Sequence, residues 1–404
     1  MQKGKRLNRE MAIVTYLFMV LFLVMAGYIM WFAVHDAEQV LNHPGNKRQE
    51  LMAKRVRRGS ILSAEGKALA QTKTDKDGNE KRVYPYDGLF AHVAGRLSHG
   101  KTGIESTESY TMLTSGVNPL LGILNEIRGE KNPGNNVVTT LSLRLSQTAG
   151  SALGSQKGAV VAIDPETGKI LAMVSKPTYD PNDLTDARWN QLTEDKGEDS
   201  ALYNRATQGL YPPGSTFKLY TALEYMREEK AYHKFQYVCK GSIGSGNDRI
   251  KCYGGEIHGR VGLTEAFAES CNAAFCQIGS GLQVSDWKSL CESLYYNKKT
   301  PLQKLEQSTS RFAITDSTAK GDIMQASIGQ GDTLVTPLQN ALLVCAAVNN
   351  GTLMRPYLLD HTEDADGNVL ETYEPVKDSQ PVTEKEAKAL KKLMRATVTE
   401  GTAH

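Results

Sequence analysis

The sequence predicts an α/β (α+β) protein in which helices pack on an antiparallel sheet, attached to a membrane by one N-terminal helix. Residues 12–34 form a single uninterrupted apolar run, and residues 158–175 have the pattern of a β-hairpin. Helical patterns follow around 216–229, 262–269 and 335–348. Together these features indicate an anchored protein with a mixed helix-and-sheet body.

The composition is that of an ordinary globular protein, with 40% hydrophobic and 23% charged residues. A length of 404 residues is enough for two or three domains. The formal net charge is +2, and the first ten residues hold four basic side chains against Glu10. The rest of the chain is therefore close to neutral, which argues against a nucleic-acid-binding protein.

The apolar run predicts a membrane anchor. Its length is sufficient to span a hydrocarbon core as a helix, whereas the apolar part of a cleaved signal peptide usually has about 7–15 residues. A basic flank precedes the run, and the acidic segment 35–38 follows it. By the positive-inside rule, we expect a cytoplasmic tail over 1–11, a transmembrane helix over 12–34, and an extracytoplasmic remainder.

The segment 35–150 is expected to form a small non-catalytic domain. Residues 35–60 look helical and charged, and residues 60–130 look like short strands broken by turn signals such as Asp77-Gly78-Asn79. Residues 135–153 have the pattern of a strand that leads into a helix. A second domain is then expected over 151–404, beginning with the hairpin around Pro165–Gly168.

The segment 209–218, GLYPPGSTFK, predicts a serine nucleophile. Its prolines and glycines end any preceding element, and a helical run begins directly afterwards, so Ser215 is expected at a helix N-terminus. Unpaired backbone N–H groups and a positive dipole at that position favour an oxyanion. Lys218 shares a helix face with Ser215, and in its neutral form it can accept the hydroxyl proton. Burial would lower the pKa of such a lysine.

The S-x-x-K spacing alone is weak evidence, because it occurs three times in this chain. Ser285/Lys288 and Ser317/Lys320 share the spacing. Neither pair follows a Pro-Pro-Gly segment or precedes an apolar helix, so both are expected on a surface helix or loop. Ser215 therefore remains the candidate.

Ser270 and Asn272 form a second candidate element, S-x-N. The hydroxyl can relay a proton towards a leaving group, and the amide can hold a substrate carbonyl. Taken alone, such a pair would more often be a helix cap. The triplet Ser245-Gly246-Asn247 has the same spacing but lies in a Gly-rich loop.

S-x-x-K followed at a distance by S-x-N is the signature of penicillin-binding proteins and serine β-lactamases. Longer segments of the sequence also resemble that family, both in the order of the motifs and in the residues that flank them. With one anchor, a short N-terminal domain and no glycosyltransferase domain, the chain resembles a class B (monofunctional) penicillin-binding protein. The resemblance implies the penicillin-binding transpeptidase fold over 151–404 and a non-catalytic pedestal over 35–150. The segments that carry it are 58–61, 103–105, 158–182, 211–218, 258–275 and 327–341.

The resemblance implies a peptidoglycan D,D-transpeptidase. Ser215 would attack the D-Ala-D-Ala bond of a stem peptide and pass the acyl group to an amine on a neighbouring strand. Lys218 would be the activating base, Ser270 the proton relay and Asn272 the residue that positions substrate. β-Lactams would acylate Ser215 as substrate mimics, and a membrane glycosyltransferase of the elongation or division machinery would be a partner. No metal or organic cofactor is implied.

The family's third box, Lys-(Thr/Ser)-Gly, is not found at its usual place. Lys101-Thr102-Gly103 has the composition but lies in the pedestal segment. By resemblance, the box should follow residues 393–403 at a short distance, so the domain as printed is expected to be incomplete and its activity impaired. Two explanations for the missing box remain open: the sequence is a fragment of a complete enzyme, or it is a natural short form. The alternatives are a catalytically impaired cell-wall scaffold, or a D,D-carboxypeptidase or β-lactamase that hands the acyl group to water.

The six cysteines all follow the anchor, and their spacing fits no common zinc pattern well. Cys239 and Cys252 flank a Gly/Ser-rich loop, and a disulfide could close its base. The alternative is a set of reduced, mostly buried cysteines. The sequence leaves both open. The six are Cys239, Cys252, Cys271, Cys276, Cys291 and Cys345.

Overall fold

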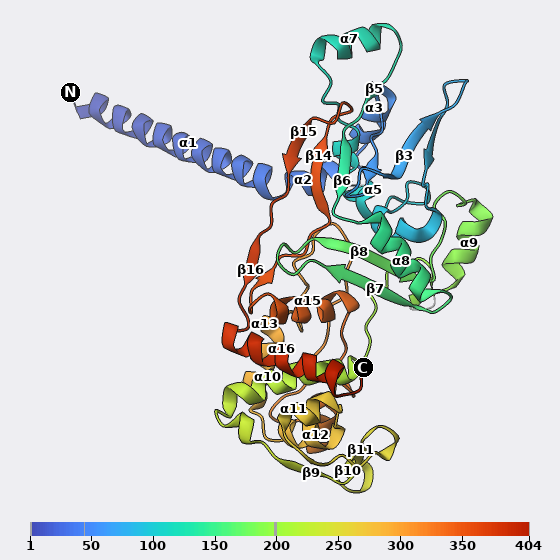
Figure 1. Cartoon of the computed structure of the whole chain (residues 1–404). Helices are drawn as coiled ribbons and strands as arrows, with labels where there is room; N and C mark the ends of the chain where they lie inside the picture. The colour runs from blue at the N-terminus through green and yellow to red at the C-terminus, as the bar shows by residue number, and fades with distance from the viewer. Residues whose placement is uncertain (1, 44, 198–199, 404) are drawn as a thin grey trace.

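We describe the protein from a computed structural model, in which residues 2–43, 45–197 and 200–403 are placed. Figure 1 shows a long helix, α1 (Gln2–His35), that projects from an elongated body. The largest sheet lies near the base of this helix, and a lobe made mostly of helices lies at the far end.

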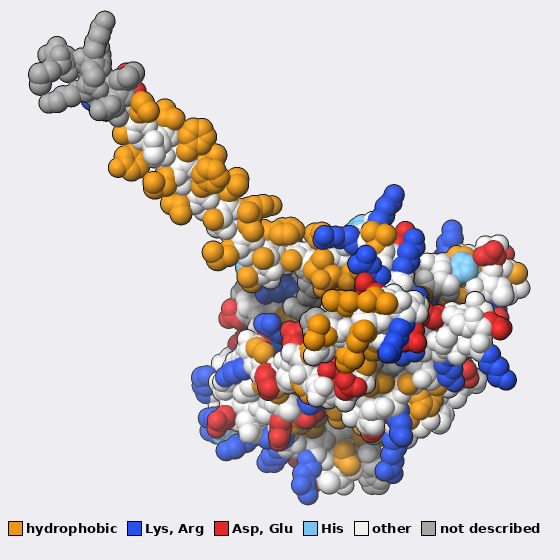
Figure 2. Space-filling model, turned by 90° about the horizontal axis from the view of Figure 1, so that it is seen from above, with side chains coloured by type: hydrophobic (Ala, Val, Ile, Leu, Met, Phe, Trp, Pro, Cys, Tyr) orange, Lys and Arg blue, Asp and Glu red, His pale blue; other side chains and the backbone are white. Residues whose placement is uncertain are grey.

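Helix α1 is continuous, so the predicted tail and anchor belong to one helix. Its segment Arg9–His35 has 27 residues. Its most apolar 18-residue stretch has a mean hydropathy of 2.4, and none of that stretch is buried against the rest of the protein. At 1.5 Å per residue this segment is about 40 Å long, more than the ~30 Å of a hydrocarbon core. Figure 2 shows hydrophobic side chains along its visible length. The helix is long and apolar enough to span a membrane, while its direction across that membrane remains a prediction.

A six-stranded sheet joins the two halves of the chain. Its order is β15-β14-β6-β2-β3-β4, with β2 parallel to β6 and the other neighbours antiparallel. β14 and β15 come from residues 359–372, yet β14 pairs with β6, where Val137 and Val138 are buried. The lobe near the anchor is therefore built from both ends of the sequence. The strands are β2 (Ile61–Leu62), β3 (Ala68–Thr74), β4 (Glu80–Val83), β6 (Asn136–Thr139), β14 (Leu359–Glu363) and β15 (Val369–Thr372).

The expectation of short strands over 60–130 is right for β2–β4 and wrong for residues 87–127, which form short helices joined by turns. α7 shows why: Asn118 accepts a hydrogen bond from the Leu120 N–H and Pro119 occupies the first turn, a combination that starts a helix. These helices are too short to show a clear apolar period in the sequence. They are η1 (Asp87–Phe90), α4 (Ala91–Ala94), α5 (Gly103–Thr107), α6 (Ser109–Met112) and α7 (Pro119–Ile127).

The expected helical stretch after the anchor is confirmed, and a buried ion-pair network follows it. Glu105 is fully buried, and its two carboxylate oxygens lie 2.7 Å from Arg58 Nε and 2.7 Å from Arg82 Nε. The two guanidinium groups outweigh the effect of burial and keep the pKa of Glu105 below its usual value. This network joins the chain directly after residue 57 to strand β4 and helix α5. The neighbouring elements are α2 (Ala37–Asn42), α3 (Arg48–Arg55), β1 (Val56–Arg57) and β5 (Asn132–Pro133).

The predicted hairpin is confirmed as β7 (Gly158–Ile163) and β8 (Ile170–Lys176), which pair antiparallel. Its turn ends at Gly168, where φ is +83°. Helix α8 (Leu143–Leu153) packs on β8, and helix α15 (Pro337–Val348) packs on β7. The expected arrangement of helices on an antiparallel sheet is therefore present.

The lobe far from the anchor is a helical core. Helix α12 lies within it, with Phe275 fully buried, and Phe217 packs against Trp287 and Phe312. The helical patterns predicted around 216–229, 262–269 and 335–348 correspond to α10, α11 and α15 within a few residues. The remaining helices are α9 (Asp186–Glu194), η3 (Gly214–Phe217), α10 (Lys218–Glu228), η4 (Tyr232–Lys234), η5 (Gly246–Asp248), η6 (Tyr253–Gly255), α11 (Leu263–Ala268), α12 (Asn272–Gly279), α13 (Val284–Ser293), α14 (Lys320–Ser327) and α16 (Glu384–Thr399).

Two small strand pairs lie against α12 at the end of this lobe (Figure 1). β9 pairs with β12, and β10 pairs with β11 within the loop between them. A third small pair joins β13 to β16. The strands are β9 (Tyr237–Cys239), β10 (Ser242–Ile243), β11 (Ile250–Lys251), β12 (Gly259–Val261), β13 (Leu353–Met354) and β16 (Lys377–Ser379).

Candidate active site

Ser215 lies in the 3-10 turn η3, which runs directly into α10 at Lys218. The structure therefore places Ser215 at the start of a helix, as the Pro-Pro-Gly sequence predicts. Its side chain is exposed, whereas Phe217 and Lys218 are buried. The turn thus presents a hydroxyl to solvent above a rigid apolar base.

A close backbone contact holds this turn in place. The Gly214 N–H donates to the Gly329 carbonyl over 2.9 Å, and Gly329 has a φ of +69°. A Cβ added at Gly329 would lie 2.3 Å from the Gly214 carbonyl oxygen. Glycine is therefore required at 329 by both conformation and space. This contact explains the position of the SIGQG segment beside the candidate nucleophile.

Lys218 is surrounded by oxygen atoms. Its Nζ lies 3.1 Å from Ser215 Oγ, 2.8 Å from Ser270 Oγ, 2.7 Å from the Ser270 carbonyl and 2.8 Å from Asn272 Oδ1. Ser270 Oγ is also 2.7 Å from Ser215 Oγ. The structure thus brings all four residues singled out in the sequence into one hydrogen-bonded cluster.

Lys218 is poised to lose its proton near neutral pH. The residue is 1% exposed, and burial lowers its pKa to about 8. Desolvation acts in this direction because it disfavours the charged ammonium. A lysine in this state can accept a proton from an adjacent hydroxyl, which a surface lysine rarely does.

Ser270 and Asn272 are positioned by a sharp turn between α11 and α12. Ser270 has a φ of +52°, a conformation that a non-glycine residue adopts only under constraint. Asn272 donates from Nδ2 to the Lys251 carbonyl over 3.0 Å, which fixes its side chain. The turn therefore holds both groups against Lys218 at a cost in backbone strain.

The serines of the other motif matches are exposed, and among the described residues none of them hydrogen-bonds to this cluster. Ser285 is on the exposed surface of α13, and Ser317 lies in an exposed loop. Ser245 and Asn247 lie at the tip of the β10–β11 hairpin. Lys101 donates to Gln49 Oε1 in the N-terminal part of the body.

The cysteines show an arrangement that the spacing did not suggest. Cys239 Sγ lies 3.7 Å from Cys252 Sγ, so the two side chains are adjacent but not bonded. Of the two alternatives that the sequence allows, the structure therefore has the free cysteines and not the disulfide. Cys271 and His258 converge on the same point. Among the described residues all six cysteines are buried and reduced. The residue spacing carries no signal of this convergence because the four side chains come from separate elements.

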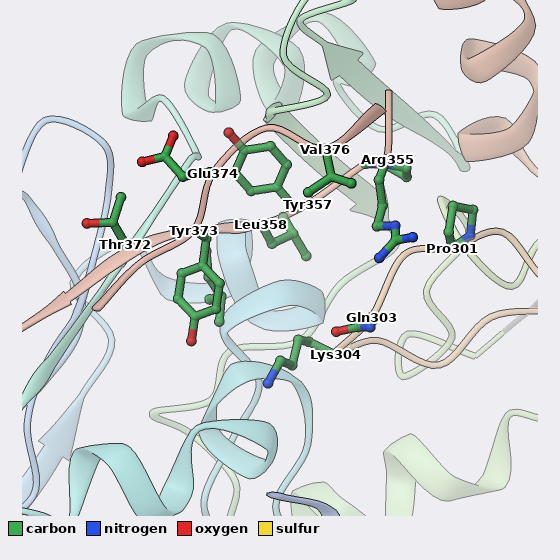
Figure 3. Close-up of a pocket in the computed structure, with 12 residues that line it drawn as sticks. Pro301, Gln303, Lys304, Arg355, Tyr357, Leu358, Thr372, Tyr373, Glu374 and Val376 are labelled. Carbon is green, nitrogen blue, oxygen red and sulfur yellow. The ribbon is translucent and has the colours of Figure 1, made fainter. Parts of the chain in front are cut away.

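A separate cavity of about 330 Å³ lies between the β14–β15 region and the 301–304 loop (Figure 3). Its lining includes Tyr357, Tyr373 and Lys304, and Lys304 Nζ lies 2.8 Å from Glu108 Oε1. None of its lining residues belongs to the Ser215 cluster. Its apolar lining belongs to the core around the six-stranded sheet, and not to the core of the lobe far from the anchor.

The Ser–Lys–Ser–Asn cluster has the arrangement that serine acyl transfer requires, with a hydroxyl in contact with a buried lysine. Residues 158–404 match the family described as penicillin binding protein transpeptidase domain, and residues 58–137 match the penicillin binding protein A dimerisation domain. The chain belongs to the penicillin-binding protein transpeptidase family, with the domain composition of its class B members.

Similar proteins carry a consistent set of names. The chain is 33% identical to the peptidoglycan D,D-transpeptidase PbpA of Mycolicibacterium smegmatis, over 96% of this chain and 82% of that protein. It is 28% identical to the peptidoglycan D,D-transpeptidase MrdA of Acinetobacter baumannii, over 70% of this chain and 48% of that protein.

Solved structures agree with this assignment. Penicillin-binding protein A of Mycobacterium tuberculosis, solved as an imipenem acyl-enzyme complex, matches with a TM-score of 0.76 and 30% identity, over 86% of this chain and 83% of that chain. The D,D-transpeptidase domain of a peptidoglycan glycosyltransferase from Eggerthella lenta matches with a TM-score of 0.76 and 28% identity, over 86% and 82%. The predicted family and fold are therefore confirmed.

Proposed function

We propose that this chain is a peptidoglycan D,D-transpeptidase that works through an acyl-enzyme on Ser215 and is acylated there by β-lactams. The observation that carries the proposal is the contact of a buried Lys218 with both Ser215 Oγ and Ser270 Oγ. The names of the similar proteins and the acyl-enzyme complexes of structural neighbours support the same chemistry.

In the first step, Ser215 Oγ attacks the carbonyl carbon of the penultimate D-Ala of a stem peptide. Neutral Lys218 accepts the hydroxyl proton as the Oγ–C bond forms. The ability of Lys218 to act as a base follows from its burial, which favours the amine form. The C–N bond to the terminal D-Ala then breaks, leaving an ester on Ser215.

Ser270 and Asn272 complete this step. Ser270 Oγ contacts both Ser215 Oγ and Lys218 Nζ, so it can pass the proton to the leaving amine of D-Ala. Asn272 Oδ1 contacts Lys218 Nζ, while its Nδ2 is held by the Lys251 carbonyl. Its amide therefore orients the lysine, and we assign it the further role of positioning the peptide.

In the second step, an amine of a neighbouring stem peptide attacks the ester carbonyl. The acceptor nitrogen loses its proton through Ser270 and Lys218, and Ser215 leaves with a proton restored. An amide bond forms as the ester bond breaks, so the net reaction exchanges one amide for another. Exclusion of water from the acyl-enzyme decides between this outcome and hydrolysis.

The apolar helix suggests where this reaction occurs. We assign residues 1–11 to the cytoplasm, 12–34 to the membrane, 35–150 to a pedestal and 151–404 to the transpeptidase domain outside the cell membrane. The exposed apolar surface of α1 supports the anchor. A membrane glycosyltransferase that supplies the glycan strands is the expected partner.

The test uses a synthetic stem peptide that ends in D-Ala-D-Ala, together with an acceptor amine. We expect the full-length gene product to release D-Ala and to form the cross-linked peptide, and Ser215→Ala to do neither. Ser285→Ala is the matched control, because its serine has the same motif spacing but lies on a surface helix. Release of D-Ala with hydrolysed peptide as the sole product would favour the D,D-carboxypeptidase alternative, and turnover by Ser215→Ala would contradict the assignment.

A further inference from the structure

Helix α7 is attached to the body by its polar side. The buried Asn132 of β5 donates from Nδ2 to the Gly122 carbonyl over 3.4 Å, and its Oδ1 accepts a hydrogen bond from Asn125 Nδ2 over 2.8 Å. The helix also starts at a defined cap, where Asn118 accepts from the Leu120 N–H over 3.0 Å. These contacts fix which side of α7 faces the body and which side faces solvent.

The side of α7 that faces solvent is apolar. Successive residues of an α-helix are ~100° apart, so its five large aliphatic side chains occupy one arc of about 160°. A surface helix normally packs such a stripe against the core, whereas here the stripe points away from it. A contiguous exposed apolar patch marks an interaction surface. The five are Leu120 (73% exposed), Leu121 (55%), Ile123 (55%), Leu124 (45%) and Ile127 (76%).

Helix α3 carries a basic face. Arg48, Leu51 and Arg55 have the spacing i, i+3 and i+7, so they share one side of the helix, and Lys54 lies next to them. All four side chains are exposed, whereas Gln49 is buried against the body. An exposed leucine is therefore surrounded by three cations.

The two faces lie at one end of the body, next to the anchor. α3 runs into β1, and β1 pairs with β5, the strand that follows α7 and holds it. Figure 1 shows α7 at the end opposite the helical lobe, and Figure 2 shows hydrophobic and basic side chains together beside the base of α1. The chain after the anchor is tied to this end, because Asn42 Oδ1 accepts from the Tyr110 N–H. A membrane that holds α1 therefore lies close to this surface.

We propose that the apolar face of α7 and the basic face of α3 rest on the anionic surface of the membrane that holds α1. Aliphatic side chains of an interfacial helix enter the boundary between headgroups and acyl chains, and lysines and arginines are attracted to anionic phospholipids. The apolar face of α7 and the cations of α3 match these two layers. The proposal adds a contact that is separate from the anchor itself.

A second copy of the chain is the competing occupant, because residues 58–137 match a domain named for dimerisation. The size of the apolar face argues against it. A helix of nine residues is about 14 Å long and ~10 Å wide, so one face of it is well short of the ~800 Å² per partner in a stable complex. A lipid surface needs no such area, since α1 already holds the protein at the membrane.

This contact would give the body a second attachment to the bilayer. A body held by α1 alone is free to turn about that helix, whereas contact through α7 fixes which side faces the lipid. Helix α10, which starts at Lys218, lies in the lobe at the opposite end of the body (Figure 1). The contact would therefore keep the Ser215 cluster away from the membrane surface.

The test measures lipid contact at single positions of the full-length protein in nanodiscs of phosphatidylglycerol and phosphatidylcholine. Ile127→Cys places a thiol on the apolar face of α7, and Val398→Cys places one on α16, in the lobe far from the anchor. Both native side chains are exposed, and the six native cysteines are buried, so a maleimide dye labels the introduced thiol. A phospholipid with a doxyl group near the top of its acyl chain quenches a dye that it touches.

We expect the doxyl lipid to quench the dye at Ile127→Cys and to leave the dye at Val398→Cys unchanged. The added double substitution Leu120→Asp and Leu124→Asp should abolish the quenching at Ile127→Cys, because it places charges on the apolar face. The fold should tolerate these two changes, since both native side chains are exposed.

The basic face is tested by the lipid charge. Replacing phosphatidylglycerol by phosphatidylcholine, or adding ~1 M salt, should weaken the quenching at Ile127→Cys because the attraction of α3 to the headgroups is electrostatic. Lys54→Gln combined with Arg55→Gln should have the same effect. Quenching that is independent of lipid charge, salt and these two residues would contradict the role given to α3.

Three other results would overturn the proposal. An unquenched dye at Ile127→Cys in anionic nanodiscs would show that lipid does not reach α7. Equal quenching at Ile127→Cys and Val398→Cys would show that the body has no fixed side towards the membrane. Protection of Ile127→Cys from aqueous iodide only in nanodiscs with two copies, without doxyl quenching, would assign the apolar face to a second copy of the chain.

Discussion

The pH dependence of acylation tests how Lys218 works. A lysine with its usual pKa of 10.5 is neutral to only ~0.03% at pH 7, whereas one with a pKa of about 8 is neutral to roughly a tenth. Burial of Lys218 therefore raises the population of the reactive amine by about 300-fold at pH 7. The rate should rise about tenfold per pH unit below pH 8 and level off above it.

The assay is the second-order rate constant for acylation of the purified full-length protein by a fluorescent penicillin between pH 5.5 and 9.5. Lys218→Arg supplies the comparison, because a guanidinium stays charged over this range and cannot act as a base. We expect that variant to be slow at every pH. Lys320→Arg, in another S-x-x-K match, should reproduce the wild-type curve. A flat wild-type profile, or a rate that keeps rising about tenfold per pH unit up to pH 9.5, would refute the role assigned to burial.

Three further predictions concern other parts of the structure. Glu105→Gln removes the partner of two buried guanidinium groups and should lower the free energy of unfolding by about 3–5 kcal/mol, measured by denaturant melts, whereas the part-exposed Glu80→Gln should cost less than about 1 kcal/mol. Equal effects would contradict the assigned network. Gly329→Ala places a Cβ 2.3 Å from the Gly214 carbonyl and should slow penicillin acylation, whereas Gly78→Ala, also at positive φ but in open space, should not. Ser270→Ala should slow acylation by about 100-fold, because it removes the proton relay; a wild-type rate would exclude that role.

The sequence was sufficient to predict the local elements and the main cluster. The apolar anchor, the 158–175 hairpin and the helix that starts at Lys218 each depend on nearby residues, and each is found where it was expected. Ser215 and Lys218 lie one helical turn apart, so their contact follows from spacing. The S-x-N motif points to Ser270 and Asn272, and the turn at Ser270 brings both side chains to Lys218.

Long-range contacts were not predictable in the same way. The pairing of β14 with β6 joins residues more than two hundred positions apart, and no local pattern signals that register. The short helices over 87–127 carry too few turns for an apolar period to emerge. The convergence of Cys239, Cys252 and Cys271 on His258 depends on how two small strand pairs fold against α12.

The central claim is that Ser215 is the residue that carries the acyl group. The most direct measurement is tandem mass spectrometry of the full-length protein after incubation with benzylpenicillin and digestion. The account predicts one adduct, on Ser215 in the peptide that contains YPPGSTFK, and none in Ser215→Ala. An adduct on another residue, or one that persists in Ser215→Ala, would contradict it.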